Sequence, residues 1–154
     1  MSKIYIYLAG PITGKSAQSA VQWRELIGNA LEGACENFVS ISPLRCESPN
    51  EDGMYPVEYE WAFAHEVTEK NKLDVQRCDA VLAYLPDGNP LSIGTILEIG
   101  WARGMGKPVI LVTNSDMVLN HPIIMADVPF RFDTRDKGWK KAVNTLKGLF
   151  EVYA

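Results

Sequence analysis

Short hydrophobic runs alternate along the chain with longer segments in which hydrophobic residues recur every three or four positions. The short runs are rich in β-branched or aromatic residues and are bounded by Gly, Pro, Asp or Asn, as buried strands are. They are too short to be helices. The predicted strands span Ile4–Ala9, Phe38–Ile41, Ala80–Leu85, Val109–Val112 and Val128–Phe132.

The longer segments have the periodicity of amphipathic helices, with one apolar stripe on each. We expect Gly33 to end the first helix and Thr134 to cap the last. Pro56 precedes the second helix, and Gly104 ends the third. The predicted helices span residues 20–34, 57–77, 93–105 and 139–150.

This alternation of strands and helices predicts parallel strands joined by right-handed crossovers, with helices on both faces of the sheet. We therefore expect a doubly wound, flavodoxin/Rossmann-like three-layer α/β sandwich with a five-stranded, mainly parallel sheet. No repeat, linker or low-complexity tract interrupts the pattern, so a single domain over residues 1–154 is expected. Such folds bind ligands at the carboxyl ends of their strands. The loops at that end cover residues 10–15, 42–56, 86–92 and 113–127.

Composition excludes several classes of protein. The chain has 154 residues, of which 47% are hydrophobic, enough for one buried core and too many for a disordered chain. The net charge of −4 argues against binding to a nucleic-acid polymer, which requires a basic surface. No apolar stretch approaches the ~20 residues that span a bilayer. The N-terminus lacks the cleavage site of a signal peptide.

The cysteines and histidines do not suggest a metal site. Cys35, Cys46 and Cys78 form no C-x-x-C pair, so we expect reduced thiols in a cytoplasmic protein. Only two histidines are present, and a structural role is expected for His65. His121 could close a pocket or serve its loop, and the sequence leaves both interpretations open.

The first loop resembles a phosphate-binding P-loop, because Gly14-Lys15-Ser16 follows a strand and precedes a helix. A P-loop needs four residues between its glycines, whereas three separate Gly10 from Gly14. Pro11 also lacks the N–H group that would contact phosphate. A small-ligand loop is therefore favoured over an NTPase, with a plain strand-to-helix turn as the alternative.

Glu98 is the first candidate for catalysis. Ser92 is a fair N-cap, which places Glu98 within about two turns of the start of a helix. Its neighbours Ile96, Leu97 and Ile99 are apolar, and burial among them would raise its pKa. A surface glutamate beside a buried stripe explains the pattern equally well.

A carboxylate can attack an anomeric carbon and hold the sugar covalently, provided that a second group protonates the leaving group. The helix before the third strand offers Phe63, Val67, Asn71 and Asp74 on one face. The alternative is a face that is partly core and partly solvated. Asp79, at the start of the third strand, is more typical of a residue that binds loop amides.

Four stretches occur in order between Lys3 and Val112. They are Tyr7-Leu8-Ala9-Gly10-Pro11-Ile12, Arg77-Cys78-Asp79-Ala80-Val81-Leu82-Ala83, Gly94-Thr95-x-x-Glu98-Ile99-Gly100-x-Ala102 and Gly106-Lys107-Pro108-Val109. Together they resemble the nucleoside 2-deoxyribosyltransferase family. The resemblance implies an enzyme that cleaves the N-glycosidic bond of a (deoxy)nucleoside and passes the sugar to another nucleobase. It implies no cofactor and no metal, since a carboxylate supplies the nucleophile.

The resemblance also assigns roles. Glu98 would be the nucleophile and Tyr7 would orient it. The family has an acidic residue that assists base departure at the position of Asn71, and an amide cannot donate that proton. Asp74, about one turn on, is the substitute we predict. The expected substrate-binding residues are Gly10, Pro11, Ile12, Phe63, Asp79, Ser92, Gly94 and Thr95, with Phe63 stacking on the base.

Ser92 stands where transferases of free deoxynucleosides often carry an aspartate. A serine there resembles the related nucleoside 5′-monophosphate N-glycosidases, so such a hydrolase is the alternative function. A non-catalytic nucleotide-sensing domain is the alternative of another class, and Asn71 is its main support. The expected partners are a small nucleoside or nucleotide, a free nucleobase and further copies of the chain. A neighbouring copy could contribute Asn120, His121 and Met125 to the site.

Overall fold

Five parallel strands form one twisted sheet in the computed structural model, which describes residues 2–58 and 60–151. The strand order is β2-β1-β3-β4-β5, and all four neighbouring pairs are parallel. The expected doubly wound sandwich with a mainly parallel sheet is therefore confirmed. The strands are β1 (Ile4–Ala9), β2 (Phe38–Ile41), β3 (Ala80–Tyr84), β4 (Val109–Thr113) and β5 (Phe130–Asp133).

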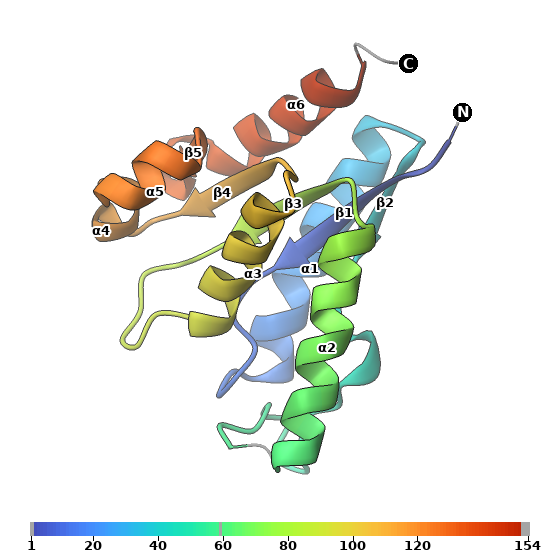
Figure 1. The fold of residues 1–154 in the computed structure, drawn as a ribbon, viewed down its shortest axis with the longest axis vertical. Coiled ribbons are helices and arrows are strands. Elements are labelled where there is room, and N and C mark those ends of the chain that lie inside the picture. Colours follow the sequence, from blue (N-terminus) through green and yellow to red (C-terminus); the bar gives the residue numbers. More distant parts are fainter. Residues whose placement is uncertain (1, 59, 152–154) are drawn as a thin grey trace.

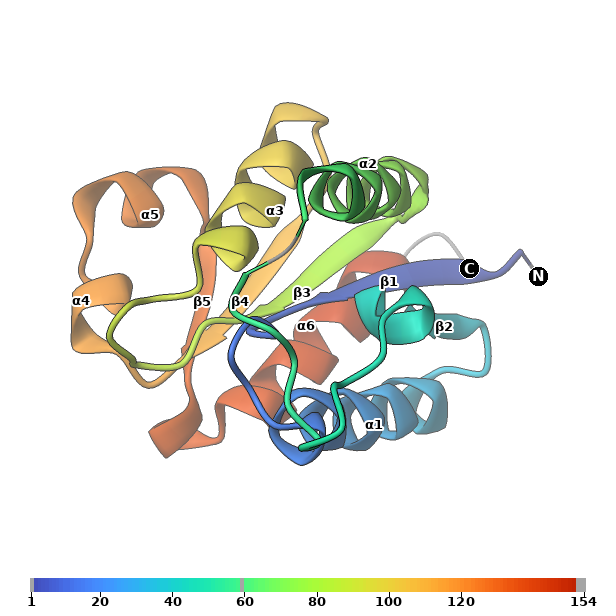
Figure 2. The ribbon, with the colours of Figure 1, turned by 90° about the horizontal axis from the view of Figure 1, so that it is seen from below.

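Helices cover both faces of the sheet (Figure 1). Figure 2 shows α2 and α3 on one face and α1 and α6 on the other. The long helices are α1 (Ala17–Ala34), α2 (Trp61–Arg77), α3 (Ile93–Gly104) and α6 (Gly138–Glu151). Shorter turns of helix are η1 (Pro43–Cys46), α4 (Asp116–Leu119), α5 (Pro122–Asp127) and η2 (Thr134–Asp136).

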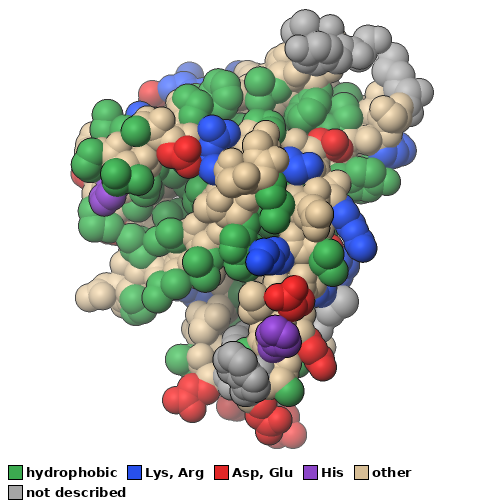
Figure 3. All heavy atoms as spheres, viewed as in Figure 1, with side chains coloured by type: hydrophobic (Ala, Val, Ile, Leu, Met, Phe, Trp, Pro, Cys, Tyr) green, Lys and Arg blue, Asp and Glu red, His purple; other side chains and the backbone are tan. Residues whose placement is uncertain are grey.

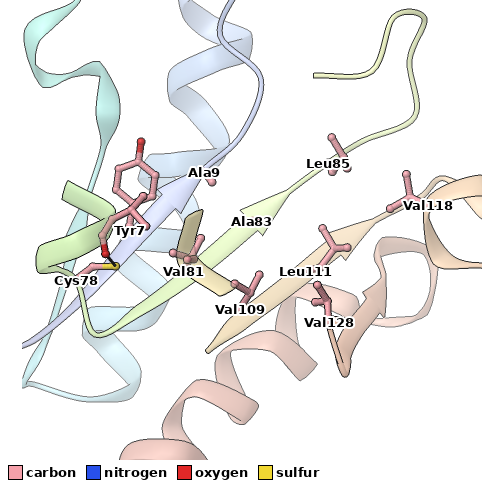
Figure 4. Close-up of a cluster of buried hydrophobic side chains, with 12 residues drawn as sticks. Tyr7, Ala9, Cys78, Val81, Ala83, Leu85, Val109, Leu111, Val118 and Val128 are labelled. Atoms are coloured by element: carbon pink, nitrogen blue, oxygen red, sulfur yellow. Dashed lines mark hydrogen bonds between the residues drawn. The ribbon is translucent and has the colours of Figure 1, made fainter. Parts of the chain in front are cut away.

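Successive strand residues bury their side chains on opposite faces of the sheet, because the side-chain period of a strand is two. Leu8 and Leu82 pack toward α1 and α6. Tyr7 and Val81 belong to the other cluster, toward α2 and α3, where Figure 4 shows Tyr7 at one end. The Tyr7 hydroxyl points away from the aliphatic side chains, toward the edge where β1 ends.

The structure corrects several predicted boundaries. Gly33 lies inside α1, which continues to Ala34 and is capped by Cys35. Thr134 begins η2 and does not cap α6; α6 starts at Gly138, after Lys137 has taken a left-handed backbone conformation. The predicted loop over residues 113–127 contains α4 and α5, which are too short to show a periodic pattern.

The structure describes the side chains of two cysteines. Cys35 and Cys78 are free thiols, and burial raises the pKa of Cys78 to about 11. The side chain of Cys46 lies outside the described part. Among the described residues, no helix combines the length and apolarity that crossing a bilayer would require.

The turn after β1 depends on close contact between Gly10 and the indole of Trp23. A Cβ atom at Gly10 would overlap this ring. The indole cannot move freely, because it packs against Tyr84 at 5.2 Å and Trp139 at 5.8 Å between ring centroids. The lack of a side chain at Gly10 therefore lets the chain leave the sheet and enter the first loop.

We predict that Gly10→Ala lowers the free energy of unfolding by about 1 to 3 kcal/mol, because the added methyl group overpacks this contact. Gly33→Ala is the matched control: it lies within α1 with open space around its Cβ, so alanine there should stabilise by about 0.5 to 1 kcal/mol. Urea unfolding of the two variants measures both effects. Equal stability changes in the two variants would contradict this account.

Candidate active site

A cleft of about 600 Å³ opens at the carboxyl ends of the central strands. Its walls come from the loop after β1, the face of α2, the loop after β3 and the first turns of α3. This is the edge of the sheet at which a doubly wound fold is expected to bind ligand. Of the predicted site residues, the cleft is lined by Gly10, Pro11, Ile12, Asn71, Ser92, Gly94, Thr95 and Glu98.

Glu98 is the buried carboxylate of this cleft. It projects from α3 and is only 7% exposed. Tyr7 is fully buried on β1, and its hydroxyl oxygen donates a hydrogen bond to Oε1 of Glu98, 3.1 Å away. Asn71 of α2 donates from Nδ2 to the same oxygen at 3.5 Å, a long hydrogen bond. Among the described residues, no donor is bonded to Oε2.

Burial raises the pKa of Glu98 to about 7, because a carboxylate is poorly solvated there. The hydrogen bond from Tyr7 opposes this shift, as do the positive charges of Arg24 and Lys70, whereas the charge of Glu47 adds to it. Burial, followed by the charge of Glu98, raises the pKa of Tyr7 as well, so the phenol keeps its proton and remains a donor. The pair thus holds an ionisable carboxylate in one fixed orientation.

Arg24 of α1 holds the end of β1 and the start of the loop that follows it. It is 4% exposed and donates to the main-chain carbonyls of Leu8, Ala20 and Gly10. Burial lowers its pKa to about 10, and the charge of Glu98 partly offsets this effect. Sequence reasoning missed Arg24, although its spacing of four residues from Ala20 and three from Ile27 places it on the buried stripe of α1.

The first turn of α3 forms the opposite wall. Ser92 caps the helix by accepting from the N–H of Thr95, and the two hydroxyl groups lie 2.7 Å apart. Thr95 is buried, so this contact fixes the start of the helix and, one turn later, the position of Glu98.

The predicted proton donor Asp74 does not lie in the cleft. Both of its carboxylate oxygens accept hydrogen bonds from the guanidinium of Arg45, at 2.5 Å each, on the side of α2 that faces η1. Lys70 lies 4.0 Å from the same carboxylate. A carboxylate in a bidentate ion pair has no proton to give, so this geometry does not support Asp74 as the acid.

The lining of the cleft also leaves out Tyr7, Asp79, Phe63 and His121. Asp79 stands at the amino end of β3, where its carboxylate accepts from the N–H of Tyr5 at 2.7 Å. This contact corresponds to the structural alternative given above. Phe63 is 39% exposed in the first turn of α2, and His121 is exposed just before α5.

Glu47 lines the cleft although no sequence pattern singled it out. It follows η1 in the predicted loop over residues 42–56, so its direction depends on tertiary packing. Among the described residues, no group of three or more His, Cys, Asp or Glu side chains could hold a metal ion. The polar side chains that line the cleft include carboxylates, amides, hydroxyl groups and the amine of Lys15.

Comparison with known proteins gives a family match and structural similarities. The family model for nucleoside 2-deoxyribosyltransferase matches residues 6–145. The 2-deoxyribosyltransferase of Bacillus psychrosaccharolyticus is similar in structure, with a TM-score of 0.63 and 19% identity over 91% of this chain and 90% of that one. The 2-deoxyribosyltransferase of Leishmania mexicana has a TM-score of 0.51 and 19% identity over 73% of this chain and 65% of that one. The CMP N-glycosidase BcmB of Clostridium botulinum has a TM-score of 0.50 and 18% identity over 93% of this chain and 98% of that one. No curated protein matches the chain.

The raised pKa of Glu98 predicts a stability that falls as pH rises. Below about pH 4.5 the carboxyl group is protonated in both states and contributes nothing. Between about 4.5 and 7 only the unfolded state releases the proton, so folding becomes less favourable, by roughly 3 kcal/mol in total. Glu98→Gln should therefore match the parent protein near pH 4.5 and exceed its stability at pH 8.

Chemical unfolding at a series of pH values measures this difference. Glu66→Gln, at an exposed position on α2, is the control and should show no comparable gain. A stability difference between Glu98→Gln and the parent that stays constant from pH 4.5 to 8 would contradict a buried, ionising Glu98.

Proposed function

Because the chain belongs to the nucleoside 2-deoxyribosyltransferase family, we propose that it cleaves the N-glycosidic bond of a (deoxy)nucleoside and transfers the sugar to a second nucleobase. The observation that carries this proposal is the orientation of Glu98. Tyr7 and Asn71 both bond to its Oε1, no described donor is bonded to Oε2, and Glu98 lines the cleft.

In the proposed reaction, Oε2 of Glu98 attacks C1′ of the sugar and forms an ester bond. The C1′–N bond breaks at the same time, and its electron pair leaves with the base. A nitrogen of the second base then attacks C1′ and displaces the carboxylate of Glu98. Tyr7 keeps the carboxylate oriented through both steps, and no cofactor is consumed.

A nucleoside 5′-monophosphate N-glycosidase is the second candidate, and the start of α3 favours it. Position 92 carries a neutral hydroxyl in place of a carboxylate, and the N-terminus of α3 opens into the cleft. Helix N-termini attract phosphate, and Lys15 lines the facing loop. In this reaction water would replace the acceptor base at the second step.

Exposed apolar side chains near the cleft also suggest an oligomer. Hydrophobic side chains gather on the face over α3, α4 and α5 (Figure 3). Ile93 and Leu97 of α3 are exposed and also line the cleft, and Met117 of α4 and Ile123 and Met125 of α5 are exposed as well. We propose that a second copy of the chain covers this apolar face, so that residues of α4 and α5 reach the neighbouring site.

Base exchange tests the proposed function. The enzyme is incubated with a deoxynucleoside and a different free base, and the new nucleoside is measured by chromatography. Exchange should accelerate as pH rises toward 7, since Glu98 must be ionised to attack. Glu98→Gln should reduce the rate by at least about a thousandfold, whereas Glu66→Gln should stay within about twofold.

A parallel incubation with a deoxynucleoside 5′-monophosphate in water separates the candidates. Release of sugar phosphate without base exchange favours the N-glycosidase. Binding of nucleotide without turnover of either substrate would contradict both enzymatic proposals and favour a sensing domain.

The oligomer proposal predicts that Ile123→Glu lowers the solution mass toward that of one chain, because a buried charge without a partner is costly at an interface. Light scattering after size exclusion measures the mass. Leu26→Glu, at an exposed position on α1 outside this face, is the control and should leave the mass unchanged. A parent protein that is monomeric and fully active would contradict the proposal.

A further inference from the structure

The departing base needs a proton that neither predicted residue can supply. It takes the electron pair of the C1′–N bond, and protonation at that moment makes it a better leaving group. Asn71 carries an amide, which has no acidic proton. Asp74 lies outside the cleft, with both carboxylate oxygens bonded to Arg45. A further proton donor must therefore come from another residue of the cleft or from water.

Glu47 is a second carboxylate in the same cleft as Glu98. The described acidic residues that line this cleft are Glu47, Asp87 and Glu98. Asp87 is exposed on the loop after β3, whereas Glu47 is half-buried and its Oε2 is shielded from solvent. Glu47 and Glu98 line the same cleft, and the charge of Glu47 adds to the raised pKa of Glu98.

The backbone of Glu47 is held firmly. Its N–H donates to the carbonyl of Leu44 at 3.0 Å, which closes the last turn of η1. Leu44 is buried in one cluster with Tyr55 and Ala20 of α1. These contacts tie Glu47 to the body of the molecule, although the surrounding loop is long.

Charged and titratable groups face Glu47 from several elements. Glu98 of α3 interacts with it electrostatically, and so do Arg24 of α1 and Tyr55 of the loop after η1. Two carboxylates in one cleft disfavour each other's negative charge, and such pairs are typical of a nucleophile working beside an acid. Tyr7 and Asn71 donate to Oε1 of Glu98 and favour its ionised form, as a nucleophile requires.

We propose that Glu47 is the general acid and base of the reaction, a catalytic residue that replaces the acid missing at Asn71. Its carboxyl proton moves to the base as the C1′–N bond breaks and Glu98 forms the ester. The carboxylate left on Glu47 then takes a proton from the incoming base, or from water in hydrolysis, as the ester breaks. Glu47 is thereby returned to its protonated form. This inference rests on the proposed function.

The test compares nucleosides whose bases differ in how readily they leave. Glu47→Gln is compared with the parent on 2′-deoxyuridine and its 5-fluoro derivative, or on 2′-deoxyguanosine and its 7-methyl derivative, in whichever base class the enzyme exchanges. The modified bases are better leaving groups, so their departure depends less on protonation by an acid. Glu47→Gln should lose about a hundredfold or more in kcat/KM on the natural nucleoside, but no more than about tenfold on the modified one.

The pH profile gives an independent readout. Loss of rate at high pH in the parent reports deprotonation of the acid, and this descending limb should disappear in Glu47→Gln. The ascending limb, due to Glu98, should remain. Glu51→Gln, an exposed position farther along the same loop, is the control and should retain both limbs.

The outcomes separate the two proposals. Equal losses on both substrates with an unchanged descending limb would overturn the role of Glu47 as acid, and so would full activity of Glu47→Gln. In either case an active parent and an inactive Glu98→Gln variant would leave the proposed function standing. A parent that neither exchanges bases nor releases sugar would overturn the proposed function and the inference together.

Discussion

The hydrogen bond from the hydroxyl of Tyr7 to Oε1 of Glu98 joins the sheet to the helix that forms the wall of the cleft. Tyr7 lies in the fully buried part of β1, and Glu98 lies about two turns beyond the cap of α3. The bond can form only if α3 packs against the sheet next to β1. Its cost is the burial of a carboxylate, which raises the pKa of Glu98 to about 7 and leaves it able to change ionisation near neutral pH.

The surrounding polar groups offset this burial without neutralising the carboxylate. The positive charge of Arg24 opposes the raised pKa of Glu98. Its guanidinium group donates to the main-chain carbonyls of Leu8 and Gly10, so it also fixes the turn at Gly10. Asn71 adds a neutral donor on the α2 side. The arrangement places two hydrogen-bond donors on one oxygen of Glu98, while no described donor is bonded to the other.

Much of the fold could be predicted from the sequence, because buried parallel strands and amphipathic helices leave strong local patterns. Strands β1 and β2 lie where the pattern placed them, and β3 and β4 differ by one residue at their ends. The short helices α4 and α5 could not be predicted, since four to six residues carry no helical period. The cleft-lining residues of the first loop and of α3 could also be predicted, because strand ends and helix starts meet at one edge.

The rest of the site depends on contacts between segments distant in sequence. Asp74 shares a helical face with Asn71 by spacing, but Arg45 of η1 binds it outside the cleft, and no local pattern reveals that pairing. Glu47 was missed for the same reason, since it follows Leu44, which packs against Ala20 of α1 and Tyr55. Arg24, by contrast, lies on the apolar stripe of α1, and its position there was a usable signal.

The most direct test of the account is to identify the residue that carries the sugar. The enzyme is mixed with a deoxynucleoside without acceptor base, quenched in acid during turnover and digested, and the peptides are analysed by mass spectrometry. The account predicts one deoxyribosyl group in ester linkage on Glu98, in the peptide from α3. A sugar attached to another residue, or steady turnover with no glycosylated peptide, would contradict it.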